Sequence, residues 1–253
     1  YSIVFINHLL RDNVSLIHAY HNLGAKVYVV GVPYWFNKRI IKQLRNEGFK
    51  LFLPEKFPFD SEVKNCLLTA TRESKRMKRN LLIVEDGGYA SSLIHRDAGL
   101  KDVLSRCVGI AEQTKHGMWL AEEIRKLYLP IITIAESRLK KTIEPQFIGD
   151  AVCRNIEILL SKIGESLRGK KVTVVGAGEI GTSIISALKE RAVVRFVEES
   201  REREVMVRLK LNVEFGTLDR LSEDSDVIIG STGKTTITAV SYTHLRAHET
   251  GRN

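Results

Sequence analysis

The chain is poor in cysteine and has no long apolar run, and each shortage excludes a class of protein. Its three cysteines, Cys66, Cys107 and Cys153, are odd in number and too widely spaced for a zinc motif or a disulfide framework. They indicate a reducing, cytoplasmic location. No apolar run approaches the length that spans a bilayer, so we expect no membrane partner. The 253 residues, 43% of them hydrophobic and 27% charged, are enough for two globular domains.

Positive charge exceeds negative charge by nine, which raises the question of a nucleic-acid partner. The one local basic cluster lies between Arg72 and Arg79, and no aromatic residue is interleaved with it for base stacking. Phosphate-bearing ligands and solubility explain a basic surface equally well. We therefore expect no nucleic acid as a partner.

A glycine turn between two apolar runs carries the most informative pattern. Residues 176–181 read Gly-Ala-Gly-Glu-Ile-Gly and follow the apolar run 172–175. In the dinucleotide-binding fingerprint, Gly176 permits the tight turn, Gly178 lets a pyrophosphate approach the backbone, and Gly181 lets the helix pack on the sheet. Glu179 and Ile180 then begin a helix whose free N–H groups face the phosphates.

An acidic residue completes this fingerprint and indicates which dinucleotide binds. Glu198 ends the second apolar run, about 20 residues after the glycines, where an acid accepts hydrogen bonds from the adenosine ribose. Because a carboxylate repels a 2′-phosphate, Glu198 favours NAD, although Arg201 and Arg203 keep NADP as an alternative. A further strand ends at Gly230, and we expect Thr232 and Gly233 beyond it to approach the cofactor.

Short apolar runs alternate with amphipathic stretches through the first part of the chain. The predicted strands are residues 27–32, 50–53, 81–84, 107–110 and 131–134. Such alternation predicts a parallel, doubly wound sheet. A long amphipathic segment, 147–167, leads into the glycine turn. The sequence therefore predicts an α/β fold of two Rossmann-like, doubly wound parallel-sheet units joined by a long helix.

The predicted domains follow from these patterns. We place a substrate domain at residues 1–145, a connecting helix at 146–168 and an NAD-binding domain at 169–239. Residues 240–253 resemble a translated adapter from a sequencing library, so we exclude them from fold reasoning and expect the natural protein to continue beyond Ala239. We expect no metal site.

Several motifs, in order along the chain, resemble the adenosylhomocysteinase family. They are Glu-Asp-Gly-Gly at 85–88, Gly-Ile-Ala-Glu-Gln-Thr-Lys-His-Gly at 109–117, Lys141 with Gly149, the glycine turn, and Ser-Thr-Gly at 231–233. The resemblance covers nearly all of residues 1–239. It implies a cytoplasmic enzyme of the methyl cycle, homo-oligomeric at full length, that uses NAD to hydrolyse S-adenosyl-homocysteine to adenosine and homocysteine through a transient 3′-ketone.

The resemblance also implies roles for single residues. Asp86 matches a catalytic, substrate-pocket carboxylate and Lys141 matches a lysine that moves the 3′-hydroxyl proton. His8 corresponds more loosely to a pocket histidine, and it is equally well explained as a helix-cap or core residue. Glu112 and Gln113 fall where the family binds its nucleoside substrate.

The NAD-contact segment and its surroundings match less completely. Thr114, Lys115 and His116 stand where the family has three threonines that contact NAD, and the last two are also compatible with solvated turn residues. Gln113 replaces a glutamate, and residues 145–146, Pro-Gln, replace an Asp-Asn pair. An amide replaces only part of a carboxylate's hydrogen bonding. Three functions therefore remain open: an enzyme of this type with altered specificity, a non-catalytic NAD-binding relative, and an NAD-dependent dehydrogenase with another substrate.

Overall fold

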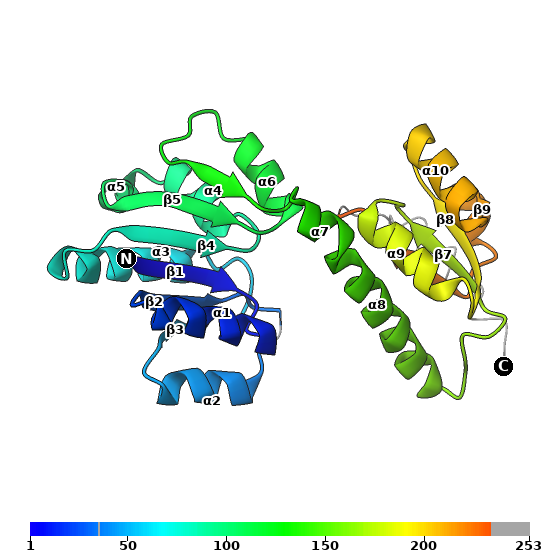
Figure 1. Cartoon of the computed structure of the whole chain (residues 1–253), viewed down its shortest axis with the longest axis horizontal. Coiled ribbons are helices and arrows are strands. Elements are labelled where there is room, and N and C mark those ends of the chain that lie inside the picture. The colour runs from blue at the N-terminus through cyan, green and yellow to red at the C-terminus, as the bar shows by residue number, and fades with distance from the viewer. Residues whose placement is uncertain (35, 234–253) are drawn as a thin grey trace. The chain divides into compact units, whose positions relative to one another are not determined.

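The structure is a computed structural model that describes residues 1–34 and 36–233. The predicted adapter-like tail at 240–253 lies outside the described residues. The chain divides into two compact units, Tyr1–Glu136 and Ser137–Asn253, and each contains its own sheet (Figure 1). Both sheets are parallel, so the predicted α/β fold is confirmed.

The first unit contains a six-stranded sheet in the order β3-β2-β1-β4-β5-β6. Its strands are β1 Ser2–Asn7, β2 Lys26–Gly31, β3 Lys50–Phe52, β4 Leu81–Glu85, β5 Cys107–Glu112 and β6 Ile131–Thr133. Its helices are α1 Arg11–Asn22, α2 Lys38–Asn46, α3 Asp60–Arg76, α4 Tyr89–Arg96, the short 3₁₀ turn η1 Ala98–Leu100, α5 Lys101–Leu104 and α6 Lys115–Glu122.

Both faces of this sheet are covered, which explains why its central strands are mostly apolar. All six residues of β1 are buried. Val4 and Ile6 pack with Leu67 of α3 on one face, whereas Phe5 packs with Ile17 and Leu44, from α1 and α2, on the other. The sheet is therefore doubly wound. The sequence patterns predicted no strand before residue 27, so the central strand β1 is an addition from the structure.

The second unit contains a four-stranded sheet in the order β10-β7-β8-β9. Its strands are β7 Lys171–Val175, β8 Val193–Val197, β9 Glu214–Phe215 and β10 Val227–Gly230. Its helices are α7 Arg138–Thr142, α8 Glu144–Ser161, α9 Glu179–Leu188, α10 Arg201–Leu211 and α11 Leu218–Ser222. Among the described residues, no helix is long and apolar enough to cross a membrane.

Helix α8, which corresponds to the predicted long helix, packs closely against α9 within the second unit. A Cβ on Gly149 would lie 2.5 Å from Ser183 Oγ, so glycine is required for this approach. Cys153 of α8 joins Val172, Ile184 and Phe196 in the core of the unit. Helix α8 therefore belongs to the core of the second unit. The domain boundaries predicted after residues 145 and 168 remain predictions.

Candidate functional site

The glycine turn of the second unit joins β7 to α9, and two of its glycines are required by the protein itself. Gly176 has a φ of +94°, in the left-handed region, and a Cβ there would lie 2.7 Å from Thr232 Cγ2. A Cβ on Gly181 would overlap the carbonyl oxygen of Gly176. These two residues therefore allow the turn and the close packing of α9.

The third glycine, Gly178, has no such structural reason. Its backbone has φ −67° and ψ −168°, which any residue can adopt, and no atom of the described residues lies within 4 Å of a Cβ placed on it. Among the described residues, no side chain caps α9 at Gly178. A glycine at the N-terminus of a helix is what a bound pyrophosphate requires.

The end of β10 borders this turn. Strands β7 and β10 are neighbours, and the chain leaves β7 toward β8 on the opposite side, so the turn stands at the topological switch point of the sheet. Ser231 Oγ donates a hydrogen bond of 2.7 Å to the carbonyl oxygen of Gly176. Thr232 packs against Gly176, and Gly233 follows with a φ of +72°. The structure therefore brings Thr232 and the glycine turn together.

Glu198 lies beside the same turn, directly after β8. Its Oε2 accepts a hydrogen bond of 2.7 Å from the Ala177 N–H, and its Oε1 accepts one of 2.9 Å from the Ser200 N–H. Arg201, a candidate for a 2′-phosphate, instead pairs at 2.5 Å with Glu204, whose side chain is 3% exposed. Of the two arginines that would favour NADP, one is thus engaged in neutralising a buried carboxylate.

The first unit has its own switch point between β1 and β4. The chain goes from β1 to β2 on one side and from β4 to β5 on the other, so His8 and Asp86 follow the two strands that flank it. Asn7, which is buried, donates a hydrogen bond of 3.0 Å from Nδ2 to Gln113 Oε1. Asn13 Nδ2 donates to Asn7 Oδ1 and to the His8 carbonyl oxygen, both at 2.7 Å. Gln113 is therefore tied to the end of β1.

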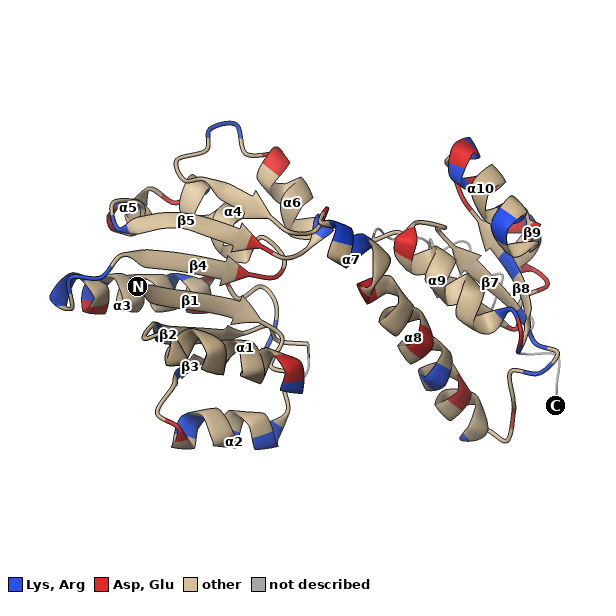
Figure 2. Cartoon of the chain, viewed as in Figure 1, with Lys and Arg blue, Asp and Glu red and all other residues tan. Residues whose placement is uncertain are grey.

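Two carboxylates are buried at the ends of β4 and β5 in the first unit (Figure 2). Glu112 accepts hydrogen bonds from the N–H groups of Gly87 at 3.2 Å, Gly88 at 2.9 Å and Thr114 at 2.7 Å. Glu85, its neighbour across the strands, accepts from the first N–H groups of α4, those of Ala90 and Ser91. The contacts of Glu112 give it a structural role in holding the 87–88 turn.

Burial and the nearby charge of Glu112 raise the pKa of Glu85 from 4.5 to about 7. The folded chain then holds this proton more tightly than the unfolded chain, so protonated Glu85 adds to the free energy of unfolding. This contribution is fully present below about pH 4.5 and is lost as pH rises through about 7. We expect the urea midpoint of the first unit to fall across this range in the wild type and to fall less in Glu85→Gln. If the urea midpoint of Glu85→Gln fell with pH as steeply as that of the wild type, the titration would belong to another group.

Aromatic rings gather beside His8 and were not anticipated from the sequence. His8 stacks on Tyr34 with ring centroids 5.5 Å apart, and Tyr34 contacts Phe57 at 4.9 Å. Tyr89, three residues after Asp86, contacts Phe59 at 4.6 Å. The only sequence signal for these residues is that they follow strand ends, where ligands bind in parallel sheets.

The residues predicted to contact NAD, to bind the substrate or to act in catalysis are divided between the two units. Thr114 caps α6: its Oγ1 donates to Glu112 and accepts from the Gly117 N–H at 3.0 Å. Lys115 pairs with Glu136 at 3.6 Å, and His116 is exposed. The first unit holds His8, Asp86, Glu112, Gln113, Thr114, Lys115 and His116, and the second holds Lys141, Gly176, Gly178, Glu179, Ile180, Gly181, Glu198, Thr232 and Gly233.

Comparison with known proteins supports a nicotinamide dinucleotide. Residues 158–250 match the family model of shikimate / quinate 5-dehydrogenase, which is fewer than half of the residues of the chain. No curated protein matches the chain. The matched segment contains β7, the glycine turn and Glu198, so the second unit is similar to NAD(P)-binding Rossmann domains.

One solved structure supports the fold over nearly the whole chain. One of the subunits of dipicolinate synthase from Bacillus halodurans is similar with a TM-score of 0.52 and 11% identity, over 98% of this chain and 79% of that one. The PH0520 protein from Pyrococcus horikoshii OT3 has a TM-score of 0.39 and 18% identity, over 82% of this chain and 62% of that one. The first similarity confirms the two-unit α/β fold.

Proposed function

We propose that the second unit binds NAD and that the chain uses it to oxidise a hydroxyl group of a nucleoside thioether transiently. The observation that carries this proposal is Gly178 at the N-terminus of α9, where no described residue requires a glycine sterically and no described side chain caps the helix. Bound NAD would supply a hydride acceptor. The adenosylhomocysteinase-like motifs support S-adenosyl-homocysteine, or a related thioether, as the substrate.

The chain's own residues then divide the work of the reaction. Lys141 takes the proton of the ribose 3′-hydroxyl. Asp86, which follows β4 at the switch point, holds the substrate or exchanges a proton with it, and His8 lines the same edge of the sheet. Oxidation of the 3′-hydroxyl acidifies the 4′-hydrogen, the thiol leaves, water adds, and reduction restores the hydroxyl. Each turnover leaves the cofactor unchanged overall.

Glu198 gives the first test, which concerns the cofactor. We expect the wild type to bind NAD more tightly than NADP, because a 2′-phosphate would face the carboxylate. Glu198→Ala should weaken NAD binding about tenfold, since a hydrogen bond to a charged group contributes about 1.5–3 kcal/mol. Calorimetric titration with both dinucleotides measures this. Glu199→Ala, at the exposed neighbouring residue, is the matched control; equal losses in both variants would contradict the assignment.

A second test concerns the reaction. S-adenosyl-homocysteine or adenosine added to NAD-loaded protein should produce the absorbance band of reduced nicotinamide. Lys141→Ala should abolish this band, because no other residue is assigned to remove the 3′ proton. Lys140→Ala is the matched control, since Lys140 pairs with Glu144 at 2.8 Å. No reduction by any nucleoside would favour a non-catalytic NAD-binding protein.

A dehydrogenase that acts on another hydroxylated substrate is the second candidate function. The match of residues 158–250 to shikimate / quinate 5-dehydrogenase favours it. The two candidates differ in stoichiometry: a dehydrogenase accumulates reduced cofactor with every turnover, whereas transient oxidation leaves at most one reduced cofactor per chain. Following the reduced band with excess NAD and either a hydroxy acid or a nucleoside therefore separates them.

A further inference from the structure

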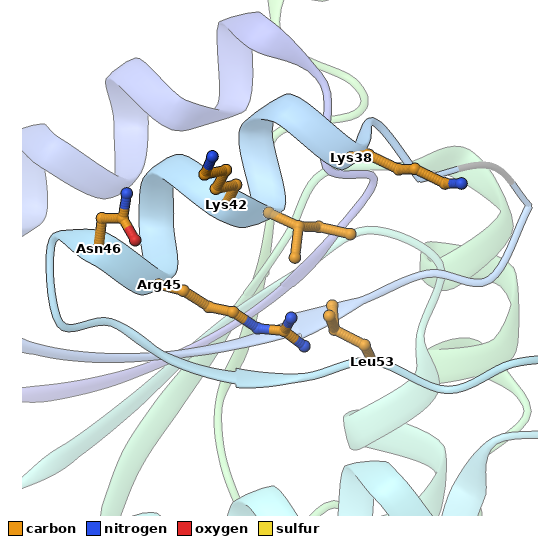
Figure 3. A pocket seen from close by; sticks show the side chains of 6 residues that line it. Lys38, Lys42, Arg45, Asn46 and Leu53 are labelled. Carbon is orange, nitrogen blue, oxygen red and sulfur yellow. The ribbon is translucent and has the colours of Figure 1, made fainter.

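A groove on the first unit lies beside α2 and Leu53, the residue that follows β3. Its volume is about 320 Å³, and Arg45 extends along it toward Leu53 (Figure 3). The groove is lined by Lys38, Ile41, Lys42, Arg45, Asn46 and Leu53. Strand β3 forms the edge of the sheet opposite β6, so the groove is apart from the switch point between β1 and β4.

The sequence of α2 explains how the groove forms. Ile40 and Leu44 are buried in the core below the sheet, which fixes the rotation of the helix. Lys38, Lys42 and Arg45 recur at i, i+4 and i+7 and therefore share a face of the helix. Ile41 and Leu53 are half-buried against the same core and give the groove an apolar floor.

The three cations of the groove have no ion-pair partner among the described residues. The carboxylate at the end of the helix, Glu47, accepts instead from His18 and Gln43, at 2.7 and 2.9 Å. Other cations of the first unit do have partners, such as Lys50 with Glu73 at 2.8 Å. Like charges one turn apart destabilise a helix, so the cations on this face of α2 repel one another. The same cations line the groove.

We propose that this groove binds a phosphorylated small molecule. Arg45 and Lys42 would hold the phosphoryl group, and an apolar part of the ligand would rest on Ile41 and Leu53. The volume is at the lower end of small-molecule sites, which run from about 300 to 1,000 Å³. The described residues that line the groove offer cations and apolar side chains and no aromatic ring for base stacking.

The test uses the full chain saturated with NAD, so that the proposed dinucleotide site is filled. Phenyl phosphate is the probe, and inorganic phosphate and phenol are its two fragments, each titrated and followed by amide NMR. Phenyl phosphate should bind more tightly than either fragment and shift the amides of α2. Arg45→Gln should weaken it about tenfold, since a charged hydrogen bond is lost.

Arg39→Gln is the matched control, because it removes the same charge from the same helix outside the groove. Its affinity for phenyl phosphate should equal that of the wild type. Equal losses in Arg39→Gln and Arg45→Gln would overturn the proposal, since they would indicate attraction by net charge alone. Absence of phenyl phosphate binding, or tighter binding of a single-stranded oligonucleotide at α2, would overturn it as well. NAD binding, measured separately, reports on the proposed function independently of these outcomes.

Discussion

Replacing Gly178 with alanine is expected to weaken NAD binding about tenfold or more while the free energy of unfolding changes little. The added Cβ meets no atom of residues 1–34 and 36–233 within 4 Å, so this part of the fold accommodates it. The same methyl group would occupy the space through which the proposed pyrophosphate would reach the start of α9, and each charged hydrogen bond lost there would cost about 1.5–3 kcal/mol. Calorimetric titration with NAD and urea unfolding measure the two effects.

Gly181→Ala is the contrasting variant in the same turn. Its Cβ would overlap the Gly176 carbonyl oxygen and approach Ser231 Oγ at 2.7 Å, so the second unit should lose stability, by about 1–3 kcal/mol or more. The two variants therefore separate a ligand requirement from a packing requirement. If Gly178→Ala bound NAD as the wild type does, the turn would not be the site of the pyrophosphate.

Glu112→Ala is expected to destabilise the first unit by at least about 3 kcal/mol, since unsatisfied buried donors cost about 1–3 kcal/mol each. The variant leaves the N–H groups of Gly87, Gly88 and Thr114 without their acceptor. Urea unfolding measures the loss. Glu122→Ala, on the exposed side of α6, is the control and should change stability by less than about 0.5 kcal/mol.

The same variant tests the substrate role predicted for Glu112. If Glu112→Ala unfolded like the wild type but lost nucleoside binding, this carboxylate would serve the ligand rather than the 87–88 turn. Glu112→Gln separates the loss of hydrogen bonds from the loss of packing, because it keeps one acceptor oxygen and the side-chain volume. We expect its stability to lie between those of Glu112→Ala and the wild type.

The parts of the fold that could be predicted from the sequence are those fixed by local patterns. The glycine turn follows from residues within one strand–turn–helix segment, and β4 follows from a continuous apolar run. Strand β1 escaped prediction because an apolar run at the start of the chain has no preceding turn or helix to define it. Helix α6 begins at Lys115 because Thr114 caps it by accepting from the Gly117 N–H.

The parts that escaped prediction are contacts between residues far apart in the chain. The hydrogen bond between Asn7 and Gln113 joins residues 106 positions apart, and an asparagine or glutamine in a sequence does not indicate which residue it will contact. The carboxylate of Glu85 is buried because β4 and β5 are adjacent, which only the assembled sheet determines. Arg201 was a candidate for a 2′-phosphate on sequence alone, but in the structure it pairs with the buried Glu204.

An amide NMR titration of the full chain with NAD tests the proposed dinucleotide site without any substrate. NAD is expected to shift the amide signals of Gly178, Glu179 and Ile180 at the start of α9, with saturation at one dinucleotide per chain. Signals from the C-terminal end of α10, near Leu211, should move less. Saturating NAD that left the three amides unshifted, or that shifted only residues of the first unit, would contradict the assignment of the dinucleotide site.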